Sequence, residues 1–357
     1  MCIRDSYCTS AYISSEYGRI SVDDFKQELD SKTGKSKIEE KPKSPPLFKF
    51  IQQELEEMES SGMRKASLGP FHRHVKVLKK FASERGSFNY EDVDWELRLE
   101  LIDWLNSKSF QLSYGNKVLS SLRQFMERAR KKKFHNNTSY QGKGWYVPRK
   151  KAVGQKAVLN PKELSKLSQL EVYGFEAKVR DLFLIGAGTG QRFSDYSQYK
   201  PENFYHTLNG TPILSVISQK TDIPAKIPLN IFPWLIPVLE RHEYCSPKVS
   251  MQKFNYCIKE LCRRLGFDDN ILIVEQYISR KARVETHYSP KYKEIASHTC
   301  RRSFATNLYR MGYQLGQIMP MTGHATESQL REYIGIDAEE NAENIASDIR
   351  RRRLNED

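Results

Sequence analysis

Apolar residues recur at the three- and four-residue spacing of amphipathic helices in four stretches between residues 45 and 136. The four stripes are Phe48, Ile51 and Leu55; Val75, Leu78, Phe81 and Ala82; Leu97, Leu101, Ile102 and Leu105; and Val118, Leu119, Leu122, Phe125 and Met126. A Gly69-Pro70 pair precedes the second stripe and is expected to interrupt the helix there. Four such helices joined by short polar segments predict a bundle of ~90 residues, enough for an independent domain.

The pattern after residue 156 mixes helices with one β-hairpin. Asn160-Pro161-Lys162-Glu163 places a capping side chain, a proline and an acid where a helix begins. Alternating β-branched residues at 213–219, a turn, and a second extended run at 225–229 predict the hairpin. The other predicted helices cover residues 175–185, 232–240, 249–265, a segment from Ser297, and an amphipathic segment at 337–351. The predicted fold class is mainly α with a small β-hairpin or sheet, an α+β arrangement.

Composition and the positions of helix-breaking residues divide the chain into four parts. Residues 1–44 form an N-terminal extension and linker, 45–136 the helical domain, 137–155 a basic linker, and 156–357 a second domain. Within the extension, Ser21-Val22-Asp23-Asp24 predicts the start of a short helix over 21–29. Residues 271–293, which include a basic loop, show no clear period, and we assign them no element.

The charge balance favours a polyanionic partner. Lys and Arg outnumber Asp and Glu by 57 to 44, giving a net charge of +13 and a pI near 9.3. Nucleic acid is therefore the first candidate partner and an anionic membrane surface the second. No apolar run approaches the ~18 residues of a spanning helix, and the N-terminus lacks the apolar core of a signal peptide, so we expect a cytoplasmic protein. With nucleic acid favoured as the partner, we expect it to be nucleoid-associated when bound to DNA and to have no membrane partner. The six cysteines show no C-x-x-C spacing, which favours reduced thiols over zinc ligands.

Most of the excess charge lies in one window. Between Lys117 and Lys156 there are twelve basic residues and one acid, Glu127, which is +11 of the net +13. A solvated helix end followed by a linker would also carry such a run. Because the window joins two domains and includes Trp145 and Tyr146, we favour a surface that contacts the phosphate backbone. Its predicted DNA-binding residues are Lys117, Arg123, Arg128, Arg130, Lys131, Lys132, Lys133, Lys143, Arg149, Lys150 and Lys151.

Residues 297–333 carry side chains suited to phosphodiester chemistry. His298 and Arg301 lie three apart on the helix predicted from Ser297, so they share a face. A guanidinium can hold two phosphate oxygens while a neighbouring imidazole donates to phosphate or accepts a proton. His324 follows a Thr-Gly turn, and Tyr333 lies nine residues later, beyond a capping box at Thr326. Taken singly, His298 at a helix start and Tyr333 are more typical of structural positions.

Taken together, these residues and two upstream ones resemble the tyrosine recombinases of the phage integrase family, of the mobile-element and prophage type. The family signature corresponds here to Arg192 in GTGQRFSD, Lys220 in QKTDIPAKIPL, His298 and Arg301 in HTCRRSFAT, His324 in TGH, and Tyr333 in LREYIG. The glycines at 186–190 match neither a dinucleotide fingerprint nor a P-loop. The resemblance spans roughly residue 45 to the end, and implies that 45–136 is a core-type DNA-binding domain and 156–357 the catalytic domain.

The sequence departs from the family pattern in three places. Asp222 and Pro224 occupy the turn after Lys220, so Lys226 remains a second, weaker candidate for the hairpin lysine of the family signature. Pro320, just before Thr-Gly-His, is expected to end a helix early. Residues 1–44 are too few for a complete arm-binding domain, so we expect at most a truncated one.

The resemblance also implies a mechanism without metal or cofactor. Tyr333 would attack the scissile phosphate and form a 3′-phosphotyrosyl link, with His298 as the base. Arg192, Arg301 and His324 would neutralise charge on phosphorus, and Lys220 would protonate the departing 5′ oxygen. Asp195, one turn after Arg192, would orient its guanidinium; a surface salt bridge is the alternative.

The implied function is site-specific recombination that integrates or excises a mobile element. The implied partners are double-stranded DNA carrying recombination sites, further copies of the chain in a tetramer on DNA, and accessory DNA-bending proteins. Residues 337–351 would dock on a neighbouring subunit. Two alternatives remain open: a DNA-binding accessory protein of the same fold that has lost cleavage, and a type IB topoisomerase-like enzyme.

Overall fold

The computed structural model describes residues 12–15, 18–21, 44–152, 154–220 and 222–334, together with 342, 343, 346, 349 and 350. The chain divides into two compact units. The helical unit comprises Met1–Arg149 and Tyr277–Ala282, and the mixed unit comprises Lys150–Gln276 and Arg283–Asp357. The helix predicted at 21–29 falls outside the described residues except for Ser21, which ends a strand, and most of the segment at 337–351 also lies outside them.

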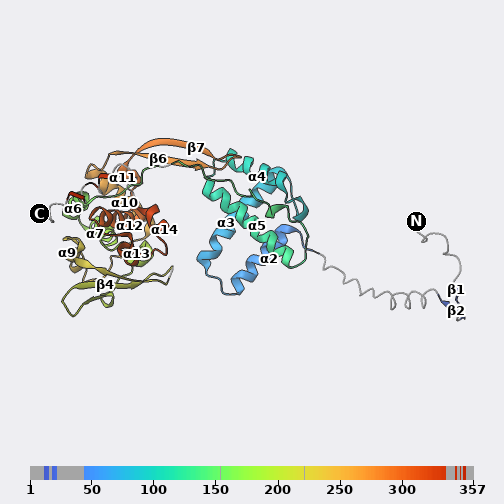
Figure 1. The fold of residues 1–357 in the computed structure, drawn as a ribbon, viewed down its shortest axis with the longest axis horizontal. Helices are drawn as coiled ribbons and strands as arrows, with labels where there is room; N and C mark the ends of the chain where they lie inside the picture. The colour runs from blue at the N-terminus through green and yellow to red at the C-terminus, as the bar shows by residue number, and fades with distance from the viewer. Residues whose placement is uncertain are drawn as a thin grey trace. The chain divides into compact units, whose positions relative to one another are not determined.

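The helical unit contains the four predicted helices (Figure 1). They are α2 (Leu47–Ser60), α3 (Lys65–Arg85), α4 (Trp95–Ser107) and α5 (Leu112–Lys131), with 3-10 turns η1 (Tyr90–Asp92) and η2 (Ser139–Gln141) and an antiparallel pair β1 (Tyr12–Ser15) and β2 (Gly18–Ser21). The expected break at Gly69-Pro70 is wrong, because Pro70 lies inside α3. Gly69 has no Cβ to clash with the proline ring, which removes much of the usual bias against helix before proline.

The core of the helical unit extends past α5 into the predicted linker. Tyr140 and Trp145 are both almost fully buried, at 0% and 1% exposure. The Trp145 indole donates to the Leu119 carbonyl at 3.1 Å, and Arg98 donates to the Trp145 carbonyl at 2.8 Å. Trp145 therefore packs in the core and does not contribute to a basic surface, whereas Tyr146 remains exposed beneath the Arg123 guanidinium.

A segment distant in sequence completes this core. Residues 270–290, to which the sequence assigned no element, form a hairpin of β6 (Asn270–Tyr277) and β7 (Arg283–Pro290), and its tip belongs to the helical unit. Ile278 is fully buried, and its amide donates to the Phe110 carbonyl at 2.9 Å. A Cβ at Gly115 would lie 2.3 Å from the Ile278 side chain, so only glycine admits this contact. Arg280 in the tip pairs with Asp103 at 3.1 Å.

We predict that Ile278→Ala destabilises the helical unit by about 2–5 kcal/mol, the usual cost of a buried cavity. Amide hydrogen exchange in α4 and α5 should accelerate accordingly, while exchange in the mixed unit should not change. The matched control is Lys281→Ala, because Lys281 is an exposed neighbour in the same tip. Equal exchange rates in the two variants would contradict the structural role of the tip.

One helix lies at the centre of the mixed unit. Helix α12 (Ser297–Arg310) packs against α7, α10, α13 and α14 (Figure 1). The other helices and turns are α6 (Pro161–Gln169), α7 (Gly174–Thr189), α8 (Phe193–Tyr196), η3 (Pro201–Asn203), η4 (Leu229–Ile231), α9 (Leu235–Glu240), α10 (Met251–Arg264), α11 (Lys291–Glu294), α13 (Leu315–Thr322) and α14 (Glu327–Tyr333). Among the described helices, none is long and apolar enough to cross a membrane.

The predicted hairpin is present as two strands of an antiparallel sheet. Strand β4 (Pro212–Ile217) pairs with β5 (Pro224–Pro228), and β3 (Phe204–His206) adds a third strand on the other side of β4. The Asn160 capping box predicted at the start of α6 is confirmed, with both reciprocal hydrogen bonds formed. The fold is thus mainly α with small antiparallel sheets, as the sequence predicts.

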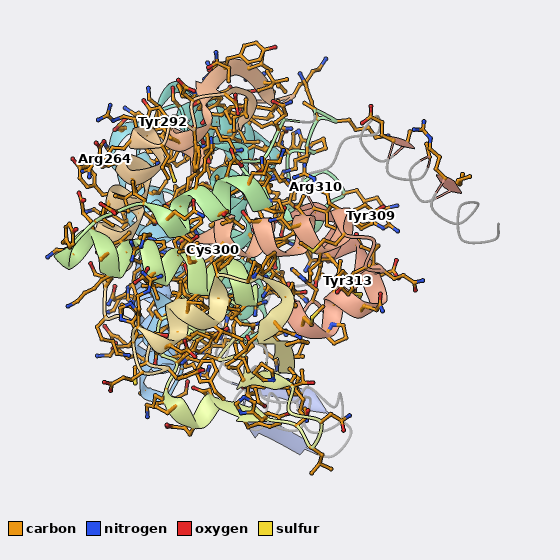
Figure 2. All side chains as sticks on the ribbon, turned by 90° about the vertical axis from the view of Figure 1, so that its left-hand side faces the viewer. Arg264, Tyr292, Cys300, Tyr309, Arg310 and Tyr313 are labelled. Carbon is orange, nitrogen blue, oxygen red and sulfur yellow. The ribbon has the colours of Figure 1, made fainter. Side chains whose placement is uncertain are left out.

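The apolar stripe of α12 anchors the helix in the core. Cys300, Phe304 and Leu308 are fully buried, whereas Met311, which follows at the same spacing, is 41% exposed because the helix ends at Arg310. Figure 2 shows Cys300 among the packed helices and Tyr309 and Arg310 at the far end of the same helix. The four cysteines among the described residues are free thiols, and three are buried.

Candidate active site

A tight turn after α7 brings two parts of the site together. Gly190 caps α7 in the left-handed conformation, with φ of 68°, and a Cβ there would lie 2.3 Å from Phe304. Only glycine fits both requirements. The Gly190 carbonyl accepts a hydrogen bond from Arg301 Nη1 at 3.1 Å, and Arg192 follows as the N-cap of α8. The turn therefore places Arg192 beside Arg301.

Arg301 is a buried guanidinium that lacks a carboxylate partner among the described residues. It is 1% exposed, and its Nη2 lies 3.1 Å from His324 Nε2. Its Nε is buried with no hydrogen-bond partner in the described part of the chain. Burial, together with the nearby Arg192 charge, lowers the pKa of Arg301 to about 10, so it is still charged at neutral pH. A buried cation with an unused donor is suited to an anionic ligand.

The contacts of His324 assign its tautomer. Arg301 can only donate, so His324 Nε2 accepts from it. On the other side of the ring, Nδ1 lies 2.8 Å from Thr322 Oγ1, whose own proton goes to the Ile318 carbonyl at 2.9 Å. The proton of a neutral His324 therefore resides on Nδ1. Burial and the charges of Arg301 and Arg192 lower the pKa of His324 to about 3.

We predict that His324 stays neutral, with its proton on Nδ1, from pH 7 down to about pH 3. Because the unfolded chain has a higher histidine pKa of 6.5, it binds more protons between these values, and this residue lowers folding stability as pH falls. Side-chain ¹⁵N chemical shifts report both the tautomer and the titration. A midpoint near 6.5, or a proton on Nε2 in the free protein, would contradict the assignment.

The helix that precedes His324 continues further than the sequence predicts. Pro320 was expected to end it early, but α13 continues through Pro320 to Thr322 and ends at Gly323 in the left-handed conformation. The Thr322 hydroxyl bonded to His324 therefore comes from the last turn of a regular helix.

Tyr333 packs against His324 and Arg301. It is the last residue of α14. Of the capping box predicted at Thr326, the structure forms the hydrogen bond from the Gln329 amide to the Thr326 side chain, at 3.3 Å. The Tyr333 ring centre lies 4.8 Å from that of His324 and 5.5 Å from the Arg301 guanidinium carbon. The phenol is half-buried, so Arg301, His324 and Tyr333 form one site that is open to solvent on the side of the tyrosine.

His298 and Lys220 border this site. His298 is exposed on α12, and partial desolvation lowers its pKa, followed by the charges of Arg302, Arg301, Arg192 and Lys220. Lys220 lies in the loop between β4 and β5, close enough to act on His298 electrostatically. Lys226 lies further along, on β5, and is not among the charges that lower the pKa of His298. All six residues of the signature thus lie in the mixed unit around one site.

Two residues that sequence reasoning missed support the site. Gln191 is 1% exposed, and its amide donates to the carbonyls of Thr189 and Met321, which ties the Arg192 turn to the end of α13. Ser218 accepts from Arg192 Nη1 at 2.8 Å. Asp195, predicted to orient Arg192, is 6% exposed and reaches Arg192 through this serine. Neither residue has a local sequence signal for this role, because Met321 lies 130 positions from Gln191 and Arg192 lies 26 positions from Ser218.

The predicted DNA-binding residues fall into two groups. Arg128 and Lys132 form ion pairs with the buried Glu54, and Arg130 pairs with Glu127. The remainder, including Lys131, Lys133 and Lys143, are exposed or half-buried.

The sequence analysis missed a second basic surface. Arg73, Lys76 and Lys80 on α3 and Lys108 after α4 line a groove with Val77, Trp104, Phe110 and Tyr114. The i, i+3, i+7 spacing on α3 is a signal that could have found it.

Comparisons with known proteins bear on the family and the fold of the chain. The family model described as "Phage integrase family" matches residues 157–340, and no curated protein sequence matches the chain. A lambda integrase dimer bound to a COC′ core site is similar at 15% identity over 81% of this chain and 95% of that one, with a TM-score of 0.56.

Two further structures have the same fold. XerH site-specific recombinase bound to palindromic difH substrate matches at 15% identity over 83% of each chain, with a TM-score of 0.59. A Tn1549 transposon integrase in complex with circular intermediate DNA matches at 13% identity over 86% of this chain and all of that one, with a TM-score of 0.58. With the family model covering more than half of the sequence, the chain belongs to the phage integrase family.

Proposed function

We propose that this protein is a site-specific recombinase that cleaves and rejoins DNA through a 3′-phosphotyrosyl intermediate, and so integrates or excises a mobile element. The observation that carries the proposal is the buried Arg301, whose unused Nε and non-carboxylate partners leave it available to a phosphate beside Tyr333. The similar structures, solved as recombinases and integrases bound to DNA, support DNA as the substrate.

The proposed step is a transesterification. Tyr333 Oη forms a bond to phosphorus, its proton passes to His298, and the bond from phosphorus to the 5′ oxygen breaks. The lowered pKa of His298 keeps its imidazole neutral near pH 7, as a proton acceptor must be. Lys220 supplies the proton that the departing 5′ oxygen takes. Rejoining runs the same transfers in reverse, so the bond energy is conserved in the tyrosyl ester.

The arginines stabilise charge on the phosphate. Arg301 and Arg192 each present a guanidinium that can hold non-bridging oxygens in a bidentate manner. His324, proposed from sequence as a third donor, accepts from Arg301 in the free site. It can donate to phosphate only when its proton moves to Nε2 as Arg301 turns to the ligand. In the free protein its role is to hold Arg301 in place.

We predict that Lys220→Ala slows cleavage by roughly 10²–10³-fold, the usual contribution of a positioned general acid, whereas Lys226→Ala leaves it nearly unchanged. Lys226 is the matched control because it lies exposed on the partner strand of the same hairpin. Single-turnover cleavage of nicked duplexes measures both. Equal rate losses in the two variants would reject the assignment of Lys220.

The helical unit is proposed to contact the DNA backbone. Exposed cations at the end of α5 and beyond it, and the α3 groove, provide charge for sequence-independent phosphate contacts. The aromatic side chains in the groove add apolar surface beside these charges. We further propose a tetramer on DNA, helped by accessory DNA-bending proteins and by docking of residues 337–351 on a neighbouring subunit. A lambda integrase tetramer bound to a Holliday junction has the same fold.

The deciding experiment incubates the full chain with nicked duplexes from the ends of its element and maps any covalent adduct by mass spectrometry. The proposal expects a phosphotyrosine on the peptide that contains Tyr333, formed only on site DNA. Retarded DNA without an adduct would identify an accessory protein that has lost cleavage. Adducts of equal yield on unrelated duplexes, with relaxation of supercoiled plasmid, would identify a topoisomerase-like enzyme.

A further inference from the structure

One serine joins the turn that carries Arg192 to the hairpin that carries Lys220. Ser218, at the end of β4, is 2% exposed and sits between Arg192 and Asp195. Its hydroxyl accepts from Arg192 Nη1 at 2.8 Å and faces Asp195 Oδ2 at 3.3 Å. Because the guanidinium can only donate, the serine proton points to the carboxylate. The chain of bonds therefore runs from Arg192 through Ser218 to Asp195.

Asp195 is hydrogen-bonded to the hairpin, and within the described part of the chain it forms no direct ion pair with Arg192. Its Oδ1 accepts from the Gln219 amide at 3.2 Å, and Ser194 also donates to it, at 3.3 Å. Both carboxylate oxygens are thus used by hydroxyl and amide donors. The carboxylate acts on Arg192 through the serine, which makes the hydroxyl the point at which the guanidinium is held.

The backbone of Ser218 has a separate task. Its amide donates to the Ile223 carbonyl at 3.0 Å, and its carbonyl accepts from the Asp222 amide at 2.8 Å. These two bonds close the loop that contains Lys220, and they do not involve the hydroxyl. Replacing the serine by alanine therefore removes the bond to Arg192 while it leaves the loop closure intact.

We propose that Ser218 is a positioning residue that holds the Arg192 guanidinium for the scissile phosphate, with Asp195 acting through it. The inference rests on the proposed function, because it assigns Arg192 to the phosphate. It separates two tasks within one hairpin: the hydroxyl of Ser218 orients the charge that stabilises the phosphate, and Lys220 handles the leaving group.

The test compares two substrates. One nicked duplex has the ordinary 5′ oxygen as leaving group, and the other has sulfur in its place, which leaves as a thiolate without needing a proton donor. Ser218→Ala should cleave both about 10²-fold more slowly than wild type, as expected for a misplaced phosphate contact. Lys220→Ala should be slow only on the oxygen substrate. Ser218→Thr, which keeps the hydroxyl, should restore most of the rate.

Controls separate positioning from folding. Ser215→Ala changes a serine on β4 that, among the described residues, is hydrogen-bonded only through its backbone, and this variant should cleave at the wild-type rate. If sulfur rescues Ser218→Ala, the serine acts through Lys220, and the proposal is wrong. Cleavage by Ser218→Ala at the wild-type rate would overturn it as well.

A second readout does not depend on cleavage. In the free protein, NMR of the Arg192 guanidinium should show slow rotation about Nε–Cζ in wild type and fast rotation in Ser218→Ala. Equal rotation in both would overturn the inference even if the wild type cleaves DNA. If the wild type forms no adduct but the rotation differs, the proposed function fails while the positioning of Arg192 by Ser218 stands.

Discussion

The Tyr333→Phe variant should bind DNA with wild-type affinity and form no covalent adduct, a loss of about 10⁴-fold or more in cleavage. The ring itself packs on His324 with centres 4.8 Å apart and lies 5.5 Å from the Arg301 guanidinium carbon. Phenylalanine keeps both contacts and removes only the hydroxyl. The variant therefore separates loss of the nucleophile from loss of the site.

The matched control for this prediction is Tyr313→Phe. Tyr313 is 40% exposed after the end of α12 and has no place in the site. It should form adducts at the wild-type rate, measured by gel mobility of labelled nicked duplex after denaturation. A persistent adduct in Tyr333→Phe would mean that another residue attacks the phosphate.

The second large effect is expected from Arg301→Lys, which should slow cleavage by about 10³-fold although it conserves the charge. The guanidinium spans two partners, the Gly190 carbonyl and His324 Nε2, each at 3.1 Å, and keeps its Nε free. An ammonium offers a point charge in place of this planar fork and cannot bind two phosphate oxygens in the same way. It also leaves the Gly190 carbonyl or His324 without its donor.

Arg310→Lys is the control for this substitution, because Arg310 lies on the same helix at its far end (Figure 2). Its cleavage rate should match wild type. Thermal unfolding of both variants distinguishes a chemical defect from a misfolded core, since Arg301 is fully buried. A cleavage rate within a few fold of wild type for Arg301→Lys would show that bidentate binding is not required.

Much of the fold follows from local pattern. The four apolar stripes became α2 to α5, and the alternating run at 213–219 became β4, because side-chain period and backbone geometry are linked. Two expected helix interruptions are wrong, and both involve proline, because α3 and α13 each continue through one. The hairpin at 270–290 escaped prediction because its tip is stabilised by a distant helical core and its sequence lacks a clear alternation.

The sequence by itself was sufficient to indicate the family, through the order of Arg192, Lys220, His298, Arg301, His324 and Tyr333. Only the tertiary structure decided how they are held. The tautomer of His324, the unpartnered Nε of Arg301 and the link from Arg192 through Ser218 to Asp195 depend on contacts between residues up to 111 positions apart. Motif spacing constrains neighbours along one helix or turn, whereas hydrogen-bond partners across a core are chosen by packing.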